Sequence, residues 1–193
     1  MTTVRNKQQV IDAAAKVFGE KGYEATRLED IAAELGILQG SLYYHIDSKA
    51  GLLRDVRVQL FQELTKNIAE TAAGSGPPDE KLRLTMRRYL QYVMQVVPLL
   101  ELWTKPPSDK RKTKKQARED REMTTELRAV WLSILREGVD AGLVRSDLDL
   151  TVAMLSVLGI CNSVGRWYDP AGELSIEQIS DIQFNICWAG IAA

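Results

Sequence analysis

The segment TRLEDIAAELGILQGSLYYHIDSK, residues 26–49, constrains the fold more than any other part of the chain. Apolar residues recur at helical spacing between Leu28 and Leu35 and predict a short helix with one apolar face. Gly36 ends this helix, because glycine turns left-handed without steric cost. A second helix of barely two turns is predicted from Gln39 to His45. Two short helices joined so tightly predict a helix-turn-helix, whose second helix enters the major groove of DNA.

The ends of these helices have recognisable capping signals. Thr26 and Glu29 have the spacing of a capping box, which predicts that the first helix begins after Thr26. Asp47 or Ser48 is predicted to cap the helix that follows. Lys49 lies in the first turn of that helix, where a cation is unfavourable against the helix dipole. A phosphate docked at this N-terminus would explain the lysine, since helix N-termini bind anions.

The second helix carries side chains suited to DNA contact. Short polar groups stand near its N-terminus, where base edges are reached in this motif, and a glycine allows close approach of the backbone. Three consecutive ring side chains cannot all be buried on one face of a helix. Phenol and imidazole groups can contact phosphates or a thymine methyl; the alternative is that the tyrosines pack in the core. With Thr26 and Lys49, the predicted DNA-contacting residues are Gln39, Gly40, Ser41, Tyr43, Tyr44 and His45.

The chain lacks the residue patterns that catalysis or metal binding requires. His45 is the only histidine, and no cysteine lies near it in sequence. A zinc site or a catalytic triad needs several such partners, and no glycine-rich phosphate loop is present. These absences argue against an enzyme with an incidental helix-turn-helix, and we expect no metal and no cofactor.

The stretch GILQGSLYYHIDSK, with Thr26 and Ile31 upstream, resembles the DNA-binding signature of TetR-type transcriptional repressors. The resemblance implies an all-α protein, with a three-helix DNA-binding domain at residues 1–50 and a helical ligand-binding and dimerisation domain at residues 51–193. It also implies a dimer that binds a palindromic operator in double-stranded DNA and is released by a small effector. Two residues depart from the pattern. Leu38 stands where the family usually has a small polar capping residue, and Ile46 where it usually has phenylalanine.

Apolar spacing predicts further helices in the remainder of the chain. One is expected from Lys49 to about Ala72, one from Asp79 until Pro98 ends or kinks it, and one reaching about Ala141. The last two, Leu150–Trp167 and a helix after Ser175, carry more apolar surface than one subunit of this size can cover. Pairing with a second copy would make a four-helix bundle across a two-fold axis, so a homodimer through these helices is expected.

The middle helices hold large, adaptable side chains that can enclose an apolar ligand; the alternative is that each is ordinary core. Segments Gly138–Asp149 and Arg166–Pro170 resemble the branch of the family that regulates lipid, acyl-CoA or steroid catabolism, which implies a small apolar effector such as an acyl-CoA. The basic run Lys110–Lys115 lies within a stretch, Lys105 to Arg121, that holds eight cations and three anions. It is either a solvated helix face or a landing site for an anionic group. The predicted ligand-contacting residues are Tyr89, Trp103, Met123, Trp131, Arg166 and Trp167.

Several features indicate a cytoplasmic protein with no membrane contact. The N-terminus MTTVRNKQQ has no apolar stretch of the signal-peptide kind. The apolar run Leu150–Val164 is interrupted by polar residues and is too short to span a bilayer. Cys161 and Cys187 lie in separate apolar segments and are expected to be reduced core residues, as the cytoplasm favours.

Charge is the main objection to a DNA-binding function. The formal net charge is −1, and residues 1–54 hold seven cations and seven anions, whereas a basic footprint is usual. A dimer reduces the difficulty by doubling the contacts. Three alternatives remain open: a protein–protein adaptor that uses the C-terminal helices for another partner, a regulator of drug efflux, and a transcriptional activator.

Overall fold

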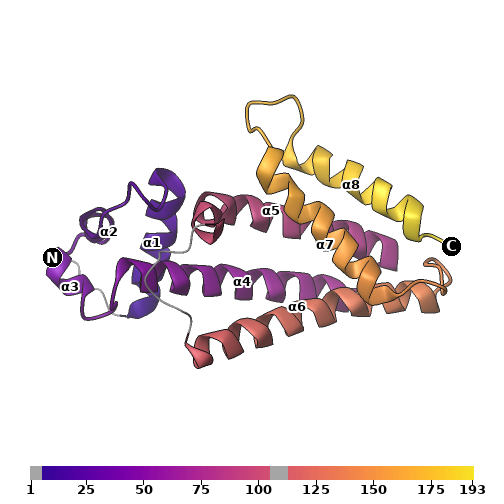
Figure 1. Ribbon diagram of the computed structural model, residues 1–193, viewed down its shortest axis with the longest axis horizontal. Coiled ribbons are helices and arrows are strands. Elements are labelled where there is room, and N and C mark those ends of the chain that lie inside the picture. The colour runs from indigo at the N-terminus through magenta and orange to yellow at the C-terminus, as the bar shows by residue number, and fades with distance from the viewer. Residues whose placement is uncertain (1–5, 105–112) are drawn as a thin grey trace. The chain divides into compact units, whose positions relative to one another are not determined.

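The computed structural model describes residues 6–104 and 113–193, with side chains omitted at 96–104 and at 115. Over these residues the chain is helical without a β-strand, so the predicted all-α class is confirmed (Figure 1). The helices are α1 (Lys7–Lys21), α2 (Leu28–Leu35), α3 (Gln39–Leu42), α4 (Lys49–Ala73), α5 (Pro78–Thr104), α6 (Lys114–Asp140), α7 (Leu150–Trp167) and α8 (Ile176–Ile191).

The described residues divide into two units. Residues 6–61 with 95–104 form the first, and residues 62–94 with 113–193 form the second. Helices α4 and α5 therefore contribute residues to both units, and α4 is one uninterrupted helix (Figure 1). These two units are the N-terminal unit and the C-terminal unit.

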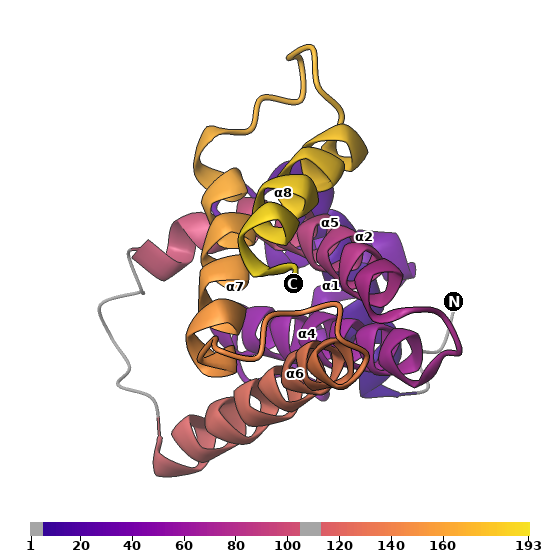
Figure 2. The same cartoon turned by 90° about the vertical axis from the view of Figure 1, so that its right-hand side faces the viewer.

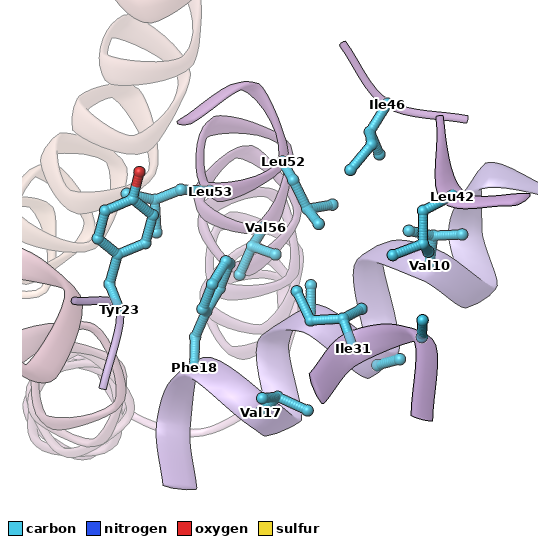
Figure 3. Close-up of a cluster of buried hydrophobic side chains, with 13 residues drawn as sticks. Val10, Val17, Phe18, Tyr23, Ile31, Leu42, Ile46, Leu52, Leu53 and Val56 are labelled. Atoms are coloured by element: carbon cyan, nitrogen blue, oxygen red, sulfur yellow. The ribbon is translucent and has the colours of Figure 1, made fainter. Parts of the chain in front are cut away.

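The N-terminal unit has a single apolar core built from α1, α2, α3 and the first turns of α4 (Figure 3). Phe18, Ile31 and Leu42 are fully buried in it. The Tyr23 ring lies 5.4 Å from the Phe18 ring and closes the core beside α1. Ile46 is also buried here, so isoleucine fills the position that is usually phenylalanine. This core fixes the place of α3, which is too short to be stable alone.

Helix ends in this unit follow from local chemistry. The Asn6 side chain accepts a hydrogen bond from the Gln9 amide at 3.0 Å and so caps α1. Gly22 and Gly36 follow α1 and α2 with φ angles of 75° and 65°, a left-handed backbone that favours glycine. The predicted stop at Gly36 is confirmed. Helix α3 is shorter than predicted, because residues 43–45 form a turn.

The C-terminal unit is built from the second part of α4, most of α5, and α6 to α8. Helices α7 and α8 lie side by side (Figure 2). The Asp149 carboxylate accepts hydrogen bonds from two amides at the start of α7. Ser175 and Gln178 form the predicted capping box of α8, with bonds of 3.3 and 2.8 Å. Helix α5 continues through Pro98 to Thr104, so it does not end at the proline.

Helix α7 is long and apolar enough, by length and composition alone, to cross a membrane. This differs from the expectation that its apolar run is too short. A core helix of a soluble protein has the same property, and α7 packs against both α6 and α8. The residues that it buries are Ala153, Met154, Val157, Leu158, Cys161 and Val164.

Candidate nucleic-acid interface and ligand-binding core

The start of α2 differs from the predicted capping box by one residue. The Asp30 carboxylate accepts a hydrogen bond from the Arg27 amide at 2.7 Å and, on its other oxygen, from the Lys21 ammonium at 2.7 Å. The bond from Lys21 and the one from the backbone of Arg27 lower the pKa of Asp30. The predicted box of Thr26 and Glu29 is therefore wrong.

Thr26 has a different role from the predicted DNA contact. Its side chain is only 1% exposed, and its hydroxyl donates to the Gly22 carbonyl at 2.7 Å. A buried hydroxyl that is satisfied by the backbone holds the turn between α1 and α2. The structure thus gives Thr26 a structural role within the DNA-binding unit, and its contact with DNA stays a prediction.

Helix α3 and the turn after it expose the other predicted residues to different degrees. Leu42 is fully buried and anchors α3, while the neighbouring Tyr43 and Tyr44 are 56% and 88% exposed. The alternative that both tyrosines pack in the core is therefore wrong. Gln39, Ser41 and His45 are half-buried. Leu42 alone anchors α3 in the core. The residues predicted to contact DNA, from Gln39 to His45, therefore lie on the side of α3 and its following turn that faces solvent.

Gly40 has open space where the Cβ of another residue would lie. A methyl group built there meets no atom within 4 Å, and its φ is not positive. Neither packing nor backbone conformation within the described chain requires glycine at this place. Close approach of another molecule to this backbone stays a prediction.

Lys49 is held against the protein by its neighbours. Ser48 caps α4, since its hydroxyl accepts from the Gly51 amide at 3.0 Å. The Lys49 ammonium lies 4.2 Å from the centre of the Tyr23 ring and 3.4 Å from the Glu24 carbonyl oxygen. Burial raises the pKa of the Tyr23 phenol. The cation–π contact gives Lys49 an intramolecular role that the sequence pattern did not reveal.

Three other lysines of the N-terminal unit are paired with carboxylates. Each N···O distance is 2.7 Å. These pairs link residues far apart in sequence, so no local signal predicted them. The pairs are Lys7–Asp55, Lys16–Glu34 and Lys21–Asp30.

In the C-terminal unit the structure brings together Tyr89 and Trp131. Their rings meet edge to face with centroids 5.7 Å apart, and Trp131 is fully buried. The Tyr89 hydroxyl donates to the Asn162 side-chain oxygen at 3.1 Å. Burial raises the pKa of Tyr89 to about 12. The Trp131 indole nitrogen is buried without a hydrogen-bond partner among the described residues, which is the kind of group that a polar ligand atom can satisfy.

The remaining predicted ligand residues belong to α5, α6 and the end of α7. Met123 is half-buried in α6. Arg166 and Trp167 are exposed at the end of α7, and the Trp167 indole nitrogen donates to Ser163 Oγ at 3.4 Å. The Trp103 side chain lies outside the described residues, as do residues 105–112, which include half of the basic run Lys110–Lys115. Of the six predicted ligand residues, Tyr89 and Trp131 are thus the two joined by a described ring contact.

Polar contacts between distant helices are features that sequence reasoning missed. The buried Lys81 ammonium of α5 contacts both carboxylate oxygens of Glu137 in α6, at 2.7 and 2.8 Å. Arg87 of α5 holds Asp181 of α8 at 2.9 Å. A hollow of about 270 Å³ near the α4–α5 turn is lined by residues that include Glu70, Thr71, Glu80, Lys81, Leu84 and Arg88.

The two final helices present exposed apolar side chains. Val152 and Ile186 are 60% and 62% exposed, and Leu155 and Ile182 are also exposed on the same pair of helices. A methyl group built on Gly159 meets nothing within 4 Å. Exposed apolar side chains grouped on one face are a feature of interaction sites, so these two helices are the candidate surface for the predicted dimer.

Metal ligands do not cluster in the described part of the chain. No group of three His, Cys, Asp or Glu side chains there is placed to hold an ion. Cys161 and Cys187 are both buried thiols, as predicted, and burial raises the pKa of Cys161 to about 12.

Comparison with known proteins gives matches over both parts of the chain. Residues 10–56 match the family "Bacterial regulatory proteins, tetR family", and residues 75–191 match "Tetracyclin repressor-like, C-terminal domain". The HTH-type transcriptional repressor KstR2 of Mycolicibacterium smegmatis is 30% identical over 193 residues, covering 96% of this chain and 90% of that protein. KstR2 of Rhodococcus jostii is 29% identical over 191 residues, covering 97% and 91%.

Solved structures show the same fold. A TetR/AcrR-family regulator from Thermobifida fusca superposes with a TM-score of 0.79 at 28% identity, covering 95% of this chain and 97% of that one. FadR of Bacillus subtilis in complex with stearoyl-CoA has a TM-score of 0.72 at 20% identity, covering 95% and 98%. AibR in complex with isovaleryl coenzyme A and operator DNA has a TM-score of 0.65 at 22% identity, covering 93% and 96%.

These matched proteins are transcriptional regulators, a class that is not enzymatic. Three observations indicate the same family. They are the helix-turn-helix with its exposed tyrosines, the helical C-terminal unit and the two family matches. The chain belongs to the TetR family and is a TetR-type DNA-binding transcriptional repressor.

Proposed function

We propose that this repressor binds a palindromic operator as a homodimer and is released from it by an acyl-CoA or a related lipid metabolite. In this proposal residues 1–50 are the DNA-binding domain and residues 51–193 bind the effector and the second subunit. The protein acts in the cytoplasm. The observation that carries the proposal is the pair of exposed tyrosines, Tyr43 and Tyr44, beside a recognition helix whose Gly40 is open to a close neighbour.

The DNA-contacting surface consists of α3 and the turn after it. Tyr43 and Tyr44 offer phenol groups to phosphates or bases, and Gln39 and Ser41 stand near the N-terminus of α3, where base edges are reached. Gly40 and His45 complete this surface, and Lys49 stands at its edge. Thr26 supports it from within, through its bond to Gly22.

The dimer is proposed to form through α7 and α8. Their exposed Val152, Leu155, Ile182 and Ile186 would be covered by the same residues of a second copy, since a two-fold interface is self-complementary. Two recognition helices about 34 Å apart would then read two half-sites one DNA turn apart. A dimer doubles the DNA contacts of a unit whose own net charge is near zero.

The effector class is supported by two kinds of observation. The FadR and AibR structures contain stearoyl-CoA and isovaleryl coenzyme A, and they share this fold. In this chain the core around Tyr89 and Trp131 combines aromatic surface with a buried indole nitrogen that has no partner among the described residues. An acyl chain would lie against these rings. The site would extend outward through the half-buried Met123 to the exposed Arg166 and Trp167. The Arg166 guanidinium can bind a phosphate of the coenzyme through two hydrogen bonds.

The mechanism is a shift between two conformations, of which one spaces the recognition helices for the operator and the other binds the effector. Moving such an equilibrium from mostly bound to mostly free requires about 5.5 kcal/mol of differential effector affinity. Helix α4 contributes residues to both units, so it is the element through which the effector is proposed to act.

Fluorescence anisotropy on the protein's own upstream DNA tests this function. Wild type, Tyr43→Phe and Tyr43→Ala are titrated against that DNA and against a scrambled sequence of equal length. The proposal expects saturable binding of a palindrome by wild type, weakened most by Tyr43→Ala, and release by one member of a series from isovaleryl-CoA to stearoyl-CoA.

Other outcomes favour the remaining candidates. Release by cationic drugs and not by acyl-CoAs would indicate a regulator of drug efflux, and increased transcription from the bound promoter would indicate an activator. Equal binding of palindrome and scrambled DNA by all three proteins would contradict operator binding at this DNA. A mass in solution other than that of a dimer would then favour an adaptor that uses α7 and α8 for another protein.

A further inference from the structure

Leu38 is the most exposed aliphatic side chain among the large apolar residues of the described chain, at 69%. The other exposed large aliphatic side chains that the structure describes belong to the C-terminal unit. Within residues 6–61, the exposed large apolar residues are Leu38, Tyr43 and Tyr44, which flank α3 within seven consecutive positions. Large exposed apolar side chains in residues 6–61 therefore lie at the two ends of the recognition helix.

Folding does not explain a leucine at this place. Leu38 is the residue that precedes α3, with extended backbone angles of −74° and 144°, and it supplies no side-chain hydrogen bond to the helix. A serine, threonine or asparagine there would satisfy an amide of the first turn. The leucine gives up that bond and leaves most of its side chain in water, so its contribution lies in contact with another molecule.

The location of Leu38 identifies that molecule as DNA. Residues at the N-terminus of a recognition helix face base edges in the major groove. A leucine side chain can neither donate nor accept a hydrogen bond, so it can read only an apolar group. The major-groove edges of the base pairs offer one such group, the C5-methyl of a pyrimidine.

We propose that Leu38 contacts a pyrimidine C5-methyl group at one position of each operator half-site and so determines the base preferred there. The methyl belongs to thymine, or to 5-methylcytosine, which presents the same group at the same place. This inference rests on the proposed operator binding and adds the base-level specificity that the proposal lacks. Burying one methyl-sized group corresponds to about a fourfold change in affinity for each half-site.

The test starts from DNA sequences selected from a random pool by the full-length protein. Each thymine of the selected site is replaced singly by uracil, which removes the methyl and keeps every hydrogen-bonding group. For wild type we expect one position per half-site where uracil weakens binding about fourfold. For Leu38→Ala we expect thymine and uracil to bind equally at that position, with the other positions unchanged.

Two further arms complete the design. If selection returns cytosine at the position, the affinities for cytosine and 5-methylcytosine are compared there. A higher affinity for 5-methylcytosine that wild type shows and Leu38→Ala lacks would identify the methyl group of 5-methylcytosine as the one contacted. Leu174→Ala, which shortens another exposed leucine in the C-terminal unit, is the matched control and should discriminate thymine from uracil as wild type does.

The outcomes are separable. Failure of wild type to select any DNA would overturn operator binding and this inference together. Selection of a site in which no pyrimidine methyl matters would overturn the inference alone. Methyl discrimination that survives in Leu38→Ala would also overturn it and would assign the contact to a neighbour such as Tyr43.

Discussion

The Lys49 ammonium lies 4.2 Å from the centre of the Tyr23 ring, so the first turn of α4 is joined to the segment between α1 and α2. A lysine at a helix N-terminus is unfavourable against the dipole. The negative face of the phenol ring offsets this cost and gives the residue a structural role independent of DNA.

Replacing Lys49 with methionine should therefore destabilise the protein even without DNA. Methionine keeps the apolar stem but removes the charge. It loses a cation–π contact of about 0.5–1 kcal/mol and also relieves part of the dipole cost, so we expect a net loss of about 0.5 kcal/mol or less. Lys49→Arg should be close to wild type, because a guanidinium also stacks on an aromatic face. Urea unfolding measures both. Equal stability of all three proteins would mean that the contact does no more than offset the dipole cost.

Gly40→Ala should separate folding from DNA binding. The open space around Gly40 and its ordinary φ predict unchanged stability or a gain of about 0.5–1 kcal/mol. Operator affinity should fall about tenfold, since a new methyl must displace DNA that approaches closely. Gly19→Ala in α1, where a methyl also meets open space, is the matched control and should bind like wild type. Full affinity in Gly40→Ala would show that DNA does not approach this backbone.

Stability should decline in alkaline solution because two buried acids resist ionisation. The pKa of Tyr89 rises from 10.0 to about 12 and that of Cys161 from 9.0 to about 12. The unfolded chain loses these protons first, so the stabilisation is complete below about pH 9 and is lost as pH rises toward 12. Thermal unfolding between pH 8 and 11 should show a shallower decline for Tyr89→Phe than for wild type, with Tyr44→Phe, which removes an exposed phenol, as control. A parallel decline in Tyr89→Phe would exclude this origin.

Ile186→Arg should convert the proposed dimer to a monomer. Ile186 is exposed on α8, and a charge buried without a partner at a two-fold interface is strongly unfavourable. Leu143→Arg, at an exposed leucine between α6 and α7, should leave the mass unchanged. Sedimentation equilibrium at several protein concentrations decides the matter. A dimeric Ile186→Arg protein would place the interface elsewhere.

Trp131 should affect the response to effector and not the binding of DNA. Trp131→Ala removes a fully buried side chain and would cost about 3–5 kcal/mol, so Trp131→Phe is the more informative change. Phenylalanine keeps much of the aromatic surface and removes an indole N–H that has no partner among the described residues. We expect normal operator affinity and a higher acyl-CoA concentration for release. An unaltered response in both variants would exclude Trp131 from the effector site.

Local signals in the sequence predicted helices and their ends well. Gly36 ends α2 and Ser175 with Gln178 caps α8, because each of these features depends on residues at most a turn apart. The same reasoning misplaced the start of α2, because Thr26–Glu29 and Arg27–Asp30 have equal spacing. Burial of the Thr26 hydroxyl against Gly22 decided between them, and burial of that residue is a property of the tertiary fold.

Contacts between helices could not be predicted in the same way. Nothing near Lys81 in sequence indicates that its partner is Glu137, and Arg87 gives no sign of Asp181. The ligand core shows the same limit, since the sequence pointed to Tyr89 and Trp131 but gave no sign of the contact between their rings or of the bond from Tyr89 to Asn162. The recognition helix was predicted more fully because its pattern is local and its exposed residues follow from one buried leucine, Leu42.

The ion pairs of the N-terminal unit have a consequence for how this repressor responds to its ionic surroundings. All four lysines between residues 6 and 61 already have an intramolecular partner, namely Asp55, Glu34, Asp30 and the Tyr23 ring. DNA binding that leaves these contacts in place neutralises few phosphates with lysine and displaces few condensed counterions by that route. The lysines of this unit should then add little to the salt dependence of operator affinity.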